Sequence, residues 1–247
     1  MKNRTWLLLS LLMLTAACQD DNEPANSITT DEAALIVSSS LASNTSGVSA
    51  VTGKAADVTV DMLAANAGGR RAACGLSQNV DLSGSSPDGA VIAYSYDFSY
   101  KFKLNCNEES QPSDVSVNLS YSGSFDAPKL SAEHSGLAEL GVTGLEDAQS
   151  EFLLNGLYKR SGSFEHKEKE QSGSSTVEIT LSDVVVDKQA HKIISGTGTY
   201  ALSGNIPGKG EFNYNGSIVF DGLGAVIDVK GAKFNANLNN GEVSIEN

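Results

Sequence analysis

The stretch IAYSYDFSYKFKLNC, residues Ile92–Cys106, decides the fold class of this chain. Its even-numbered positions are apolar or aromatic, and from Ser95 to Asn105 its odd-numbered positions are small and polar or charged. A period of two places alternate side chains on opposite faces of a β-strand, with one face buried and the other solvated. At about 3.3 Å per residue the strand is about 50 Å long, which predicts a large sheet around it.

The same alternation continues through most of the chain. From residue 72 onward, short connections predict a curved antiparallel meander of about 8–10 strands. Asn240-Gly241 predicts a tight hairpin turn that sets Leu238 opposite Val243. The candidate strands cover 74–82, 91–106, 114–126, 151–166, 175–187, 192–204, 210–221, 224–230, 232–238 and 242–246.

Two helices are expected before the sheet, within residues 28–69. The spacing of Thr29 and Glu32 is that of a capping box and predicts a helix over 28–43. A second helix is expected from about residue 54 to 67, after a loop. The predicted fold class is therefore α+β, predominantly β, with both helices packed on the apolar face of the sheet.

Glycine recurs on the apolar face of the expected strands, flanked by large residues. Glycine weakens a strand interior, so its repeated use there needs a reason. Three reasons are open: bends in a wide sheet, room for a closely packed helix, or a ligand cavity. The recurrences are Tyr121-x-Gly123-x-Phe125, Leu154-x-Gly156-x-Tyr158, Ile194-x-Gly196-x-Gly198-x-Tyr200 and Tyr214-x-Gly216-x-Ile218.

Residues 1–17 have the pattern of an export signal. Basic Lys2 and Arg4 precede an apolar run that is too short to span a bilayer. The following segment, Leu14-Thr15-Ala16-Ala17-Cys18, resembles the lipobox of bacterial lipoproteins, with Thr15 where the leucine usually stands. The resemblance implies cleavage before Cys18 and acylation of that residue, which would anchor the chain to a membrane. The alternative is a plain secretory signal that ends in a lone cysteine.

An acidic tether follows, over residues 18–27. Its segment Gln19-Asp20-Asp21-Asn22-Glu23 is similar to the export tag of surface lipoproteins in some Gram-negative lineages. The resemblance implies an outer-membrane lipoprotein exposed on the cell surface, with the periplasmic face of that membrane as the second location. The net charge of −13 argues against nucleic acid as a partner and against adsorption on anionic membranes. A surface protein or a glycan is the partner expected for the single globular domain over 28–247.

Cys74 and Cys106 are expected to form a disulfide, because disulfides persist outside the cytoplasm. A turn at Ser86–Gly89 would fold the preceding chain back on the long strand and bring the two cysteines together. The alternative is two buried free thiols. The same pairing predicts two apolar contacts on one face: Val80 with Tyr100 and Leu82 with Phe98.

Motifs of common catalytic and metal sites are not matched. His134, His166 and His191 lie far apart, and none has a second ligand at metal spacing. The nucleophile elbow Gly-x-Ser-x-Gly does not occur. A two-carboxylate hydrolase stays open, although no carboxylate pair can be assigned. We therefore expect a protein without a cofactor that is not an enzyme.

The aromatic face of the long strand allows two interpretations. It is either sheet core beneath the helices or a groove for an apolar or sugar ligand, because each buried tyrosine hydroxyl needs a partner. Two functions follow: a lipid-anchored, non-enzymatic binding, adhesion or structural module, or a carrier of a lipid or other apolar ligand between sheet and helices. The face consists of Tyr94, Tyr96, Phe98, Tyr100 and Phe102.

Overall fold

A computed structural model describes residues 27–66, 74–146, 149–222 and 224–246. The expected signal peptide, Cys18 and almost all of the acidic tether lie outside these residues. The helices are α1 (Thr30–Leu41), the short 3₁₀ turns η1 (Ser43–Thr45) and η2 (Lys167–Lys169), and α2 (Val48–Asn66). The strands are β1 (Ser77–Ser85), β2 (Ala93–Cys106), β3 (Pro112–Asp126), β4 (Leu130–Thr143), β5 (Glu151–His166), β6 (Gln171–Asp187), β7 (Ile193–Ile206), β8 (Gly210–Phe220), β9 (Gly224–Val229), β10 (Ala232–Asn237) and β11 (Val243–Ile245).

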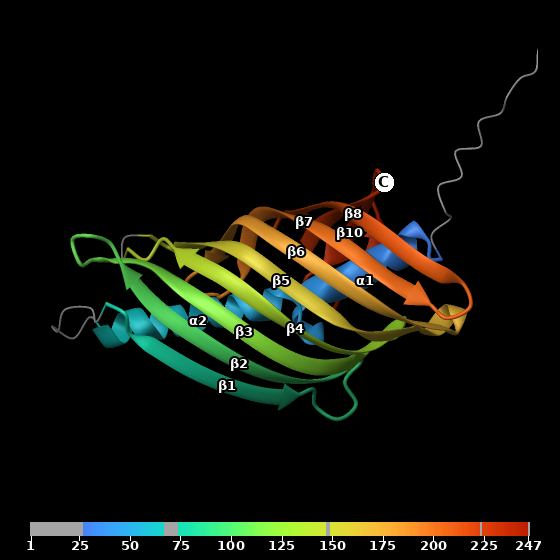
Figure 1. Ribbon diagram of the computed structural model, residues 1–247, viewed down its shortest axis with the longest axis horizontal. Coiled ribbons are helices and arrows are strands. Elements are labelled where there is room, and N and C mark those ends of the chain that lie inside the picture. The colour runs from blue at the N-terminus through green and yellow to red at the C-terminus, as the bar shows by residue number, and fades with distance from the viewer. Residues whose placement is uncertain (1–26, 67–73, 147–148, 223, 247) are drawn as a thin grey trace, which may run out of the picture.

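All the strands belong to one antiparallel sheet, and their spatial order follows the sequence from β1 to β11. Each strand therefore pairs with the next through a short connection, which confirms the predicted meander (Figure 1). The described sheet has eleven strands, one more than the upper end of the predicted range. The strands at its two ends, β1 and β11, are edges, so the sheet is open.

The strand absent from the prediction is β4. After Leu130 its next inward positions are Ala132, His134, Gly136 and Ala138, so a run of large apolar residues that would mark a strand is missing. Pairing with both neighbours supplies what local propensity lacks, because β4 is hydrogen-bonded to β3 and to β5 along its whole length. A strand of this kind is specified by its neighbours and not by its own pattern.

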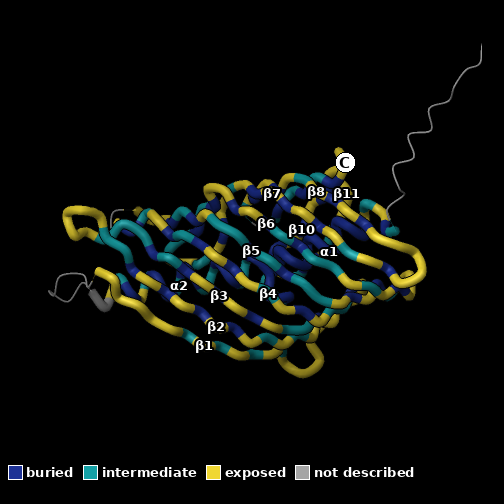
Figure 2. Tube along the Cα trace, in the orientation of Figure 1, coloured by how far each residue is buried: buried dark blue, intermediate teal, exposed yellow. Residues whose placement is uncertain are grey.

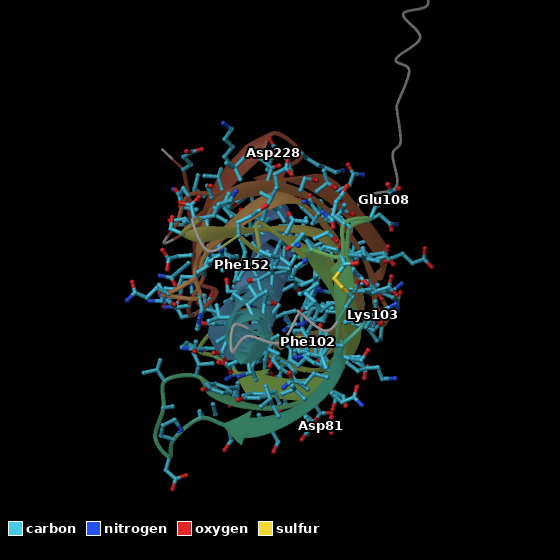
Figure 3. All side chains as sticks on the ribbon, turned by 90° about the vertical axis from the view of Figure 1, so that its left-hand side faces the viewer. Asp81, Phe102, Lys103, Glu108, Phe152 and Asp228 are labelled. Carbon is cyan, nitrogen blue, oxygen red and sulfur yellow. A yellow bond between two sulfur atoms is a disulfide. The ribbon has the colours of Figure 1, made fainter. Side chains whose placement is uncertain are left out.

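The sheet curls around both helices, which lie in its concave face (Figure 3). Phe102 and Phe152 point into this interior, whereas Asp81 and Lys103 point outward. Buried and exposed residues alternate along the strands, as a period of two requires (Figure 2). The helices and the sheet share one hydrophobic core, as the prediction of helices packed on the apolar face requires. Neither helix of the described chain is long and apolar enough to cross a membrane.

Helix α1 begins with the predicted capping box. The Thr29 hydroxyl accepts a hydrogen bond from Glu32 N at 3.3 Å, and the Glu32 carboxylate accepts from Thr29 N at 2.7 Å. Tyrosines of the sheet hold the helical segment at both ends, because Tyr214 Oη donates to Ile28 O at 2.6 Å and Tyr158 Oη donates to Ser46 O at 3.2 Å.

Helix α2 begins at Val48, about six residues earlier than predicted. Its first turns contain β-branched Val51 and Thr52, followed by Gly53, all of which have low helix propensity. Burial against the sheet overrides this preference, since Val48 and Val51 are at most 1% exposed. The predicted loop before the helix is correspondingly shorter.

The recurrent glycines serve different purposes. Gly156, at φ 144°, lies at an irregularity in the β5–β6 register, where the sheet bends. Gly216 lies beneath a tyrosine ring of the preceding strand, and so does Gly136, a glycine of β4 outside the predicted recurrences. Tyr121 Oη crosses Gly136 to donate to Lys159 O two strands away, at 3.2 Å. In the same way, the ring of Tyr200 covers Gly216 and its hydroxyl donates to Asp228 O at 2.9 Å, the oxygen that a Cβ at Gly216 would overlap.

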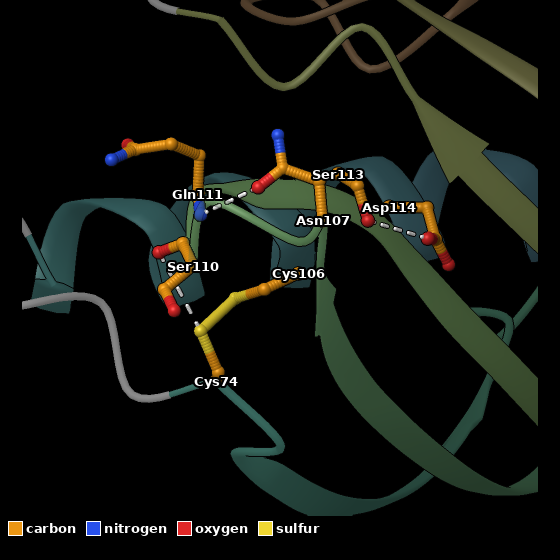
Figure 4. Close-up of a disulfide and its surroundings, with 7 residues drawn as sticks. All are labelled: Cys74, Cys106, Asn107, Ser110, Gln111, Ser113 and Asp114. Carbon is orange, nitrogen blue, oxygen red and sulfur yellow. Dashed lines mark hydrogen bonds between the residues drawn. A yellow bond between two sulfur atoms is a disulfide. The ribbon is translucent and has the colours of Figure 1, made fainter.

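The first hairpin has the predicted register and cysteine pair. The sulfur atoms of Cys74 and Cys106 lie 2.13 Å apart, at disulfide-bonding distance (Figure 4). The link joins the chain just before β1 to the end of β2 and closes the open end of this hairpin. The observed register contains both predicted apolar pairs, Val80 with Tyr100 and Leu82 with Phe98.

The last hairpin differs from its prediction by two residues. Val243 pairs with Ala236 and not with Leu238, so the turn is longer than the two residues predicted. The Asn237 side chain explains the difference, because its Oδ1 accepts from the amides of Asn239 and Asn240 and so stabilises a wider turn. A slip of two residues keeps every side chain on its predicted face.

Candidate functional site

The open side of the sheet holds a cavity of about 1010 Å³, which we name the seam cavity. One wall is the β1–β2 turn with the start of β2, residues 86–94, together with residues 125–130 around the β3–β4 turn. The facing wall consists of Asp221, Gly224 and Ala225 together with residues 235–237 and 240–244, around β9, β10 and β11. Helix α1 and η1 form its floor, so the cavity lies where the two edges of the sheet approach each other.

The floor of the seam cavity is fixed to the C-terminal wall by hydrogen bonds. Ser38 Oγ donates to Gly241 O at 2.9 Å, Ser43 N donates to Leu238 O at 2.8 Å, and Asn44 N donates to Asn239 O at 2.9 Å. The apolar part of the lining comes from residues of the hydrophobic core and its margin: Leu35, Ile92, Phe125, Leu130 and Val243. These bonds join walls from opposite ends of the sequence, so the cavity has a rigid base.

The opposite wall is more exposed. The β1–β2 turn contains Val91, whose side chain is 81% exposed. An exposed valine beside the cavity extends the apolar part of its lining to the rim. Ser86 closes the turn, since Ser86 N donates to Tyr94 O and Ser86 Oγ accepts from Tyr94 N.

A second hollow of about 480 Å³, which we name the β2–α2 groove, adjoins the cavity. It lies between the first turns of α2 and the aromatic face of β2, and its lining shares Asn44 and Tyr94 with the seam cavity. Its helix-side lining includes Ser46 and Ser49, and its strand-side lining includes the aromatic residues Tyr94, Tyr96 and Phe98.

The structure divides the predicted aromatic face into two parts. Tyr94 and Tyr96 are half-buried, stack with ring centroids 6.4 Å apart, and line the groove together with Phe98. Tyr100 and Phe102 are each 1% exposed and belong to the core beneath the helices. The groove interpretation therefore fits the first part of the strand, and the core interpretation fits the second.

Behind the groove lies a buried guanidinium. Arg160, on β5, is 6% exposed, and no carboxylate pairs with it among the described residues. Its Nη1 donates to Ser39 O at 2.7 Å, and its Nη2 donates to Thr45 O. Both oxygens are backbone acceptors near the end of α1, where the helix dipole favours a cation. The charge is therefore compensated only by neutral groups.

His134, on β4, is the third partner of this guanidinium. Its Nε2 lies 3.3 Å from Arg160 Nη2, and its ring contacts the rings of Tyr121 and Phe125. Burial, followed by repulsion from Arg160, lowers the pKa of His134 to about 2. The imidazole is therefore neutral, accepts through Nε2, and carries its proton on Nδ1, which has no described acceptor.

Carboxylates are few at the two hollows. Asp221 and Glu242 line the seam cavity, and Asp57 lines the groove. Asp57 already interacts with Lys54, whose Nζ lies 2.5 Å from Oδ2, and with the His191 ring, whose Nδ1 lies 3.7 Å from Oδ1. Within the described ranges, no three His, Cys, Asp or Glu side chains gather as a metal site.

Sequence reasoning missed the helical side of both hollows. Asn44, Ser46 and Ser49 fall in the segment that was expected to be a loop, and their positions depend on where α2 begins. The exposed Val91, an apolar residue directly after a turn, was a signal available in the sequence. Arg160 gave a signal that was not used: it falls on the inward, even-numbered positions of its strand, between Tyr158 and Phe164.

The described residues thus bring together an open cavity, an aromatic groove and a buried cation. Comparison with protein-family models, with curated proteins and with solved structures finds no match to this chain.

Proposed function

We propose that this protein is a non-enzymatic binding module that takes up a small apolar or amphipathic ligand in the seam cavity. Acyl groups on Cys18 would hold it at the outer membrane, exposed on the cell surface. The observation that carries the proposal is the cavity of about 1010 Å³ on a hydrogen-bonded base. Its volume is at the upper end of the usual range for small-molecule sites.

The location of this cavity refines the carrier hypothesis. The central space between sheet and helices is occupied by packed side chains, including Tyr100, Phe102 and Tyr158, each at most 1% exposed. A ligand would therefore bind at the seam between the sheet edges and not beneath the helices. Entry there needs no separation of the helices from the sheet.

The test uses the chain from residue 19 onward, which contains every described element and the whole hydrophobic core. Native mass spectrometry of this chain should detect a co-purifying ligand, or the chain should bind the neutral probe N-phenyl-1-naphthylamine with increased fluorescence. Ala127→Trp, in the cavity lining, should weaken probe binding about tenfold or more by filling space.

Ala201→Trp is the matched control, because Ala201 is exposed on the outer face of β7. This variant should bind the probe like the unmodified chain. Absence of both a co-purifying ligand and probe binding would refute the proposed function.

A further inference from the structure

We propose that the β2–α2 groove binds the oxyanion head of an amphiphile, a carboxylate or a phosphate, whose apolar chain lies in the seam cavity. The inference rests on the proposed function and names the ligand class. It is supported by the start of helix α2, by hydroxyls without partners, by the local charge and by the lining that the two hollows share.

The start of α2 is an uncapped helix N-terminus. In an α-helix the first amides have no acceptor within the helix. Among the described residues, no oxygen accepts from the amides of Val48 or Ser49, and the first turn contains no acidic side chain. A helix of 19 residues has a full macrodipole, and its N-terminus favours an anion.

Ser46 supplies an independent indication of a ligand. It is 2% exposed and lines the groove, yet its Oγ has no hydrogen-bond partner in the described structure. The Oγ of Ser49, also in the lining, is buried and unpartnered as well. A buried hydroxyl without a hydrogen-bond partner destabilises the folded protein. Two such hydroxyls beside one helix N-terminus therefore indicate that a ligand supplies the missing acceptor.

The backbone of Ser46 strengthens this interpretation. It adopts the left-handed conformation, at φ 58°, which glycine adopts without strain. Ser46 N donates to Ser43 O, and Ser46 O accepts from Tyr158 Oη, so the backbone is held firmly while the side chain is not. A serine here costs conformational energy and gains no described hydrogen bond in return.

The charges around the groove favour an anion. Arg160 donates to Thr45 O, one residue before Ser46, and has only neutral partners. A Cβ placed on Gly123 would lie 3.3 Å from His134 Nε2 and 3.4 Å from Ser46 Oγ, so the hydroxyl and the imidazole both lie close to Gly123, and the same imidazole nitrogen contacts the Arg160 guanidinium. Backbone carbonyls of α1 and η1 offset part of the guanidinium charge.

At the open side of the groove, Lys54 and His191 face one carboxylate, Asp57. The lysine balances that carboxylate, so the buried guanidinium and the helix N-terminus are left as the local excess of positive potential.

The groove and the seam cavity are neighbours that share part of their lining. Tyr94 and Asn44 line both hollows. From Tyr94, the rings of Tyr96 and Phe98 extend along the groove, with centroids 4.7 Å apart. An anionic head at the start of α2 would therefore leave its apolar chain against aromatic rings and within reach of the cavity.

The test compares three ligands that share one chain length: dodecanoate, dodecyl phosphate and dodecanol. Each competes with N-phenyl-1-naphthylamine for the chain from residue 19 onward, below micelle-forming concentrations. Both anions should displace the probe at a concentration about tenfold lower than dodecanol, because hydrogen bonds to a charged acceptor are stronger than those to a neutral one. Inorganic phosphate alone should not displace dodecanoate.

The decisive variant is Ser46→Gly, which removes the hydroxyl and suits the left-handed backbone. It should reduce the affinity for both anions about tenfold, leave dodecanol binding unchanged, and fold at least as stably as the unmodified chain. Ser110→Gly is the matched control, because Ser110 also has a left-handed backbone, at φ 60°, but lies in the exposed β2–β3 turn.

The outcomes separate the two proposals. Equal binding of the alcohol and the anions, or an unchanged anion affinity in Ser46→Gly, would overturn the headgroup site and leave the proposed function intact. Displacement of dodecanoate by inorganic phosphate would show that the groove binds a free anion, and would overturn the inference that its ligand is an amphiphile. Absence of binding by every ligand and by the probe would refute the proposed function itself.

Discussion

Tyr121 and Gly136 are cross-strand neighbours whose side chains depend on each other. The tyrosine ring lies over the glycine, and its hydroxyl reaches Lys159 O because no side chain intervenes. Covering a strand glycine with an aromatic ring removes exposed backbone from water and fills the gap on the apolar face. The glycine and the tyrosine were both visible in the sequence, but their contact was not.

Gly136→Ala should destabilise the protein by about 1–3 kcal/mol, because the new methyl group overlaps Lys159 O and displaces the Tyr121 ring. Gly141→Ala, on the same strand, is the control, since a Cβ there meets no atom within 4 Å. That variant should be neutral or slightly stabilising. Urea unfolding measures both, and equal effects would show that the ring contact does not explain the glycine.

His134 should make the protein less stable in acid. Its pKa is about 2 when folded, against an ordinary value of 6.5, so between these limits the unfolded chain binds a proton that the folded protein does not. The free energy of unfolding should therefore fall as the pH falls below 6.5, by about 2–3 kcal/mol from this residue at pH 4.5.

The check compares urea unfolding of the unmodified chain and of His134→Gln at pH 6.5 and at pH 4.5. Glutamine is neutral throughout, so the variant should lose about 2–3 kcal/mol less over this interval, whatever its absolute stability. Parallel losses in the two proteins would show that His134 does not titrate as its burial and Arg160 require.

At the scale of elements, β1 is the strand whose stability depends most on the disulfide. It is an edge strand with no described partner beyond β2, and most of its residues are exposed or half-buried. An edge strand gains little from burial, so the link between Cys74 and Cys106 supplies stability that packing does not. The link also holds the end of the hairpin opposite the seam cavity.

Reduction of this disulfide should lower the free energy of unfolding by roughly 3–4 kcal/mol in the chain-entropy model. The loss should be concentrated in β1, whose amides should exchange with deuterium faster than those of β3. A Cys74→Ser, Cys106→Ser double variant should behave like the reduced protein. Two titratable thiols in the unreduced protein would contradict the pairing.

Prediction of individual elements succeeded where local chemistry is sufficient. The capping box of α1 and the alternation of β2 depend on neighbours in sequence and agree with the structure. Strand β4 and the start of α2 were not predicted, because each is stabilised by contacts with distant elements. The same is true of the site: Tyr94 and Tyr96 were identified, whereas Ser46 and Arg160 were not.

The whole molecule is expected to depend on its anchor for its location. If Cys18 is acylated, the full-length protein should fractionate with membranes, and the intact mass of its mature amino terminus should include acyl groups. Cys18→Ala should abolish acylation. If the protein is also displayed on the surface, protease treatment of intact cells should digest it. Protection from the protease would contradict surface display.

The sequence by itself determined the fold class, the meander order, the cysteine pair and the aromatic face of β2. All of these follow from a period of two, from turn residues and from neighbouring positions, which are local physical signals. Only the tertiary structure decided where the hollows lie. A seam cavity exists because β1–β2 and β9–β11 approach each other across α1, and that approach depends on bends and twists summed over the whole sheet. These bends and twists accumulate over all the strands, so no short stretch of sequence predicts where the edges meet.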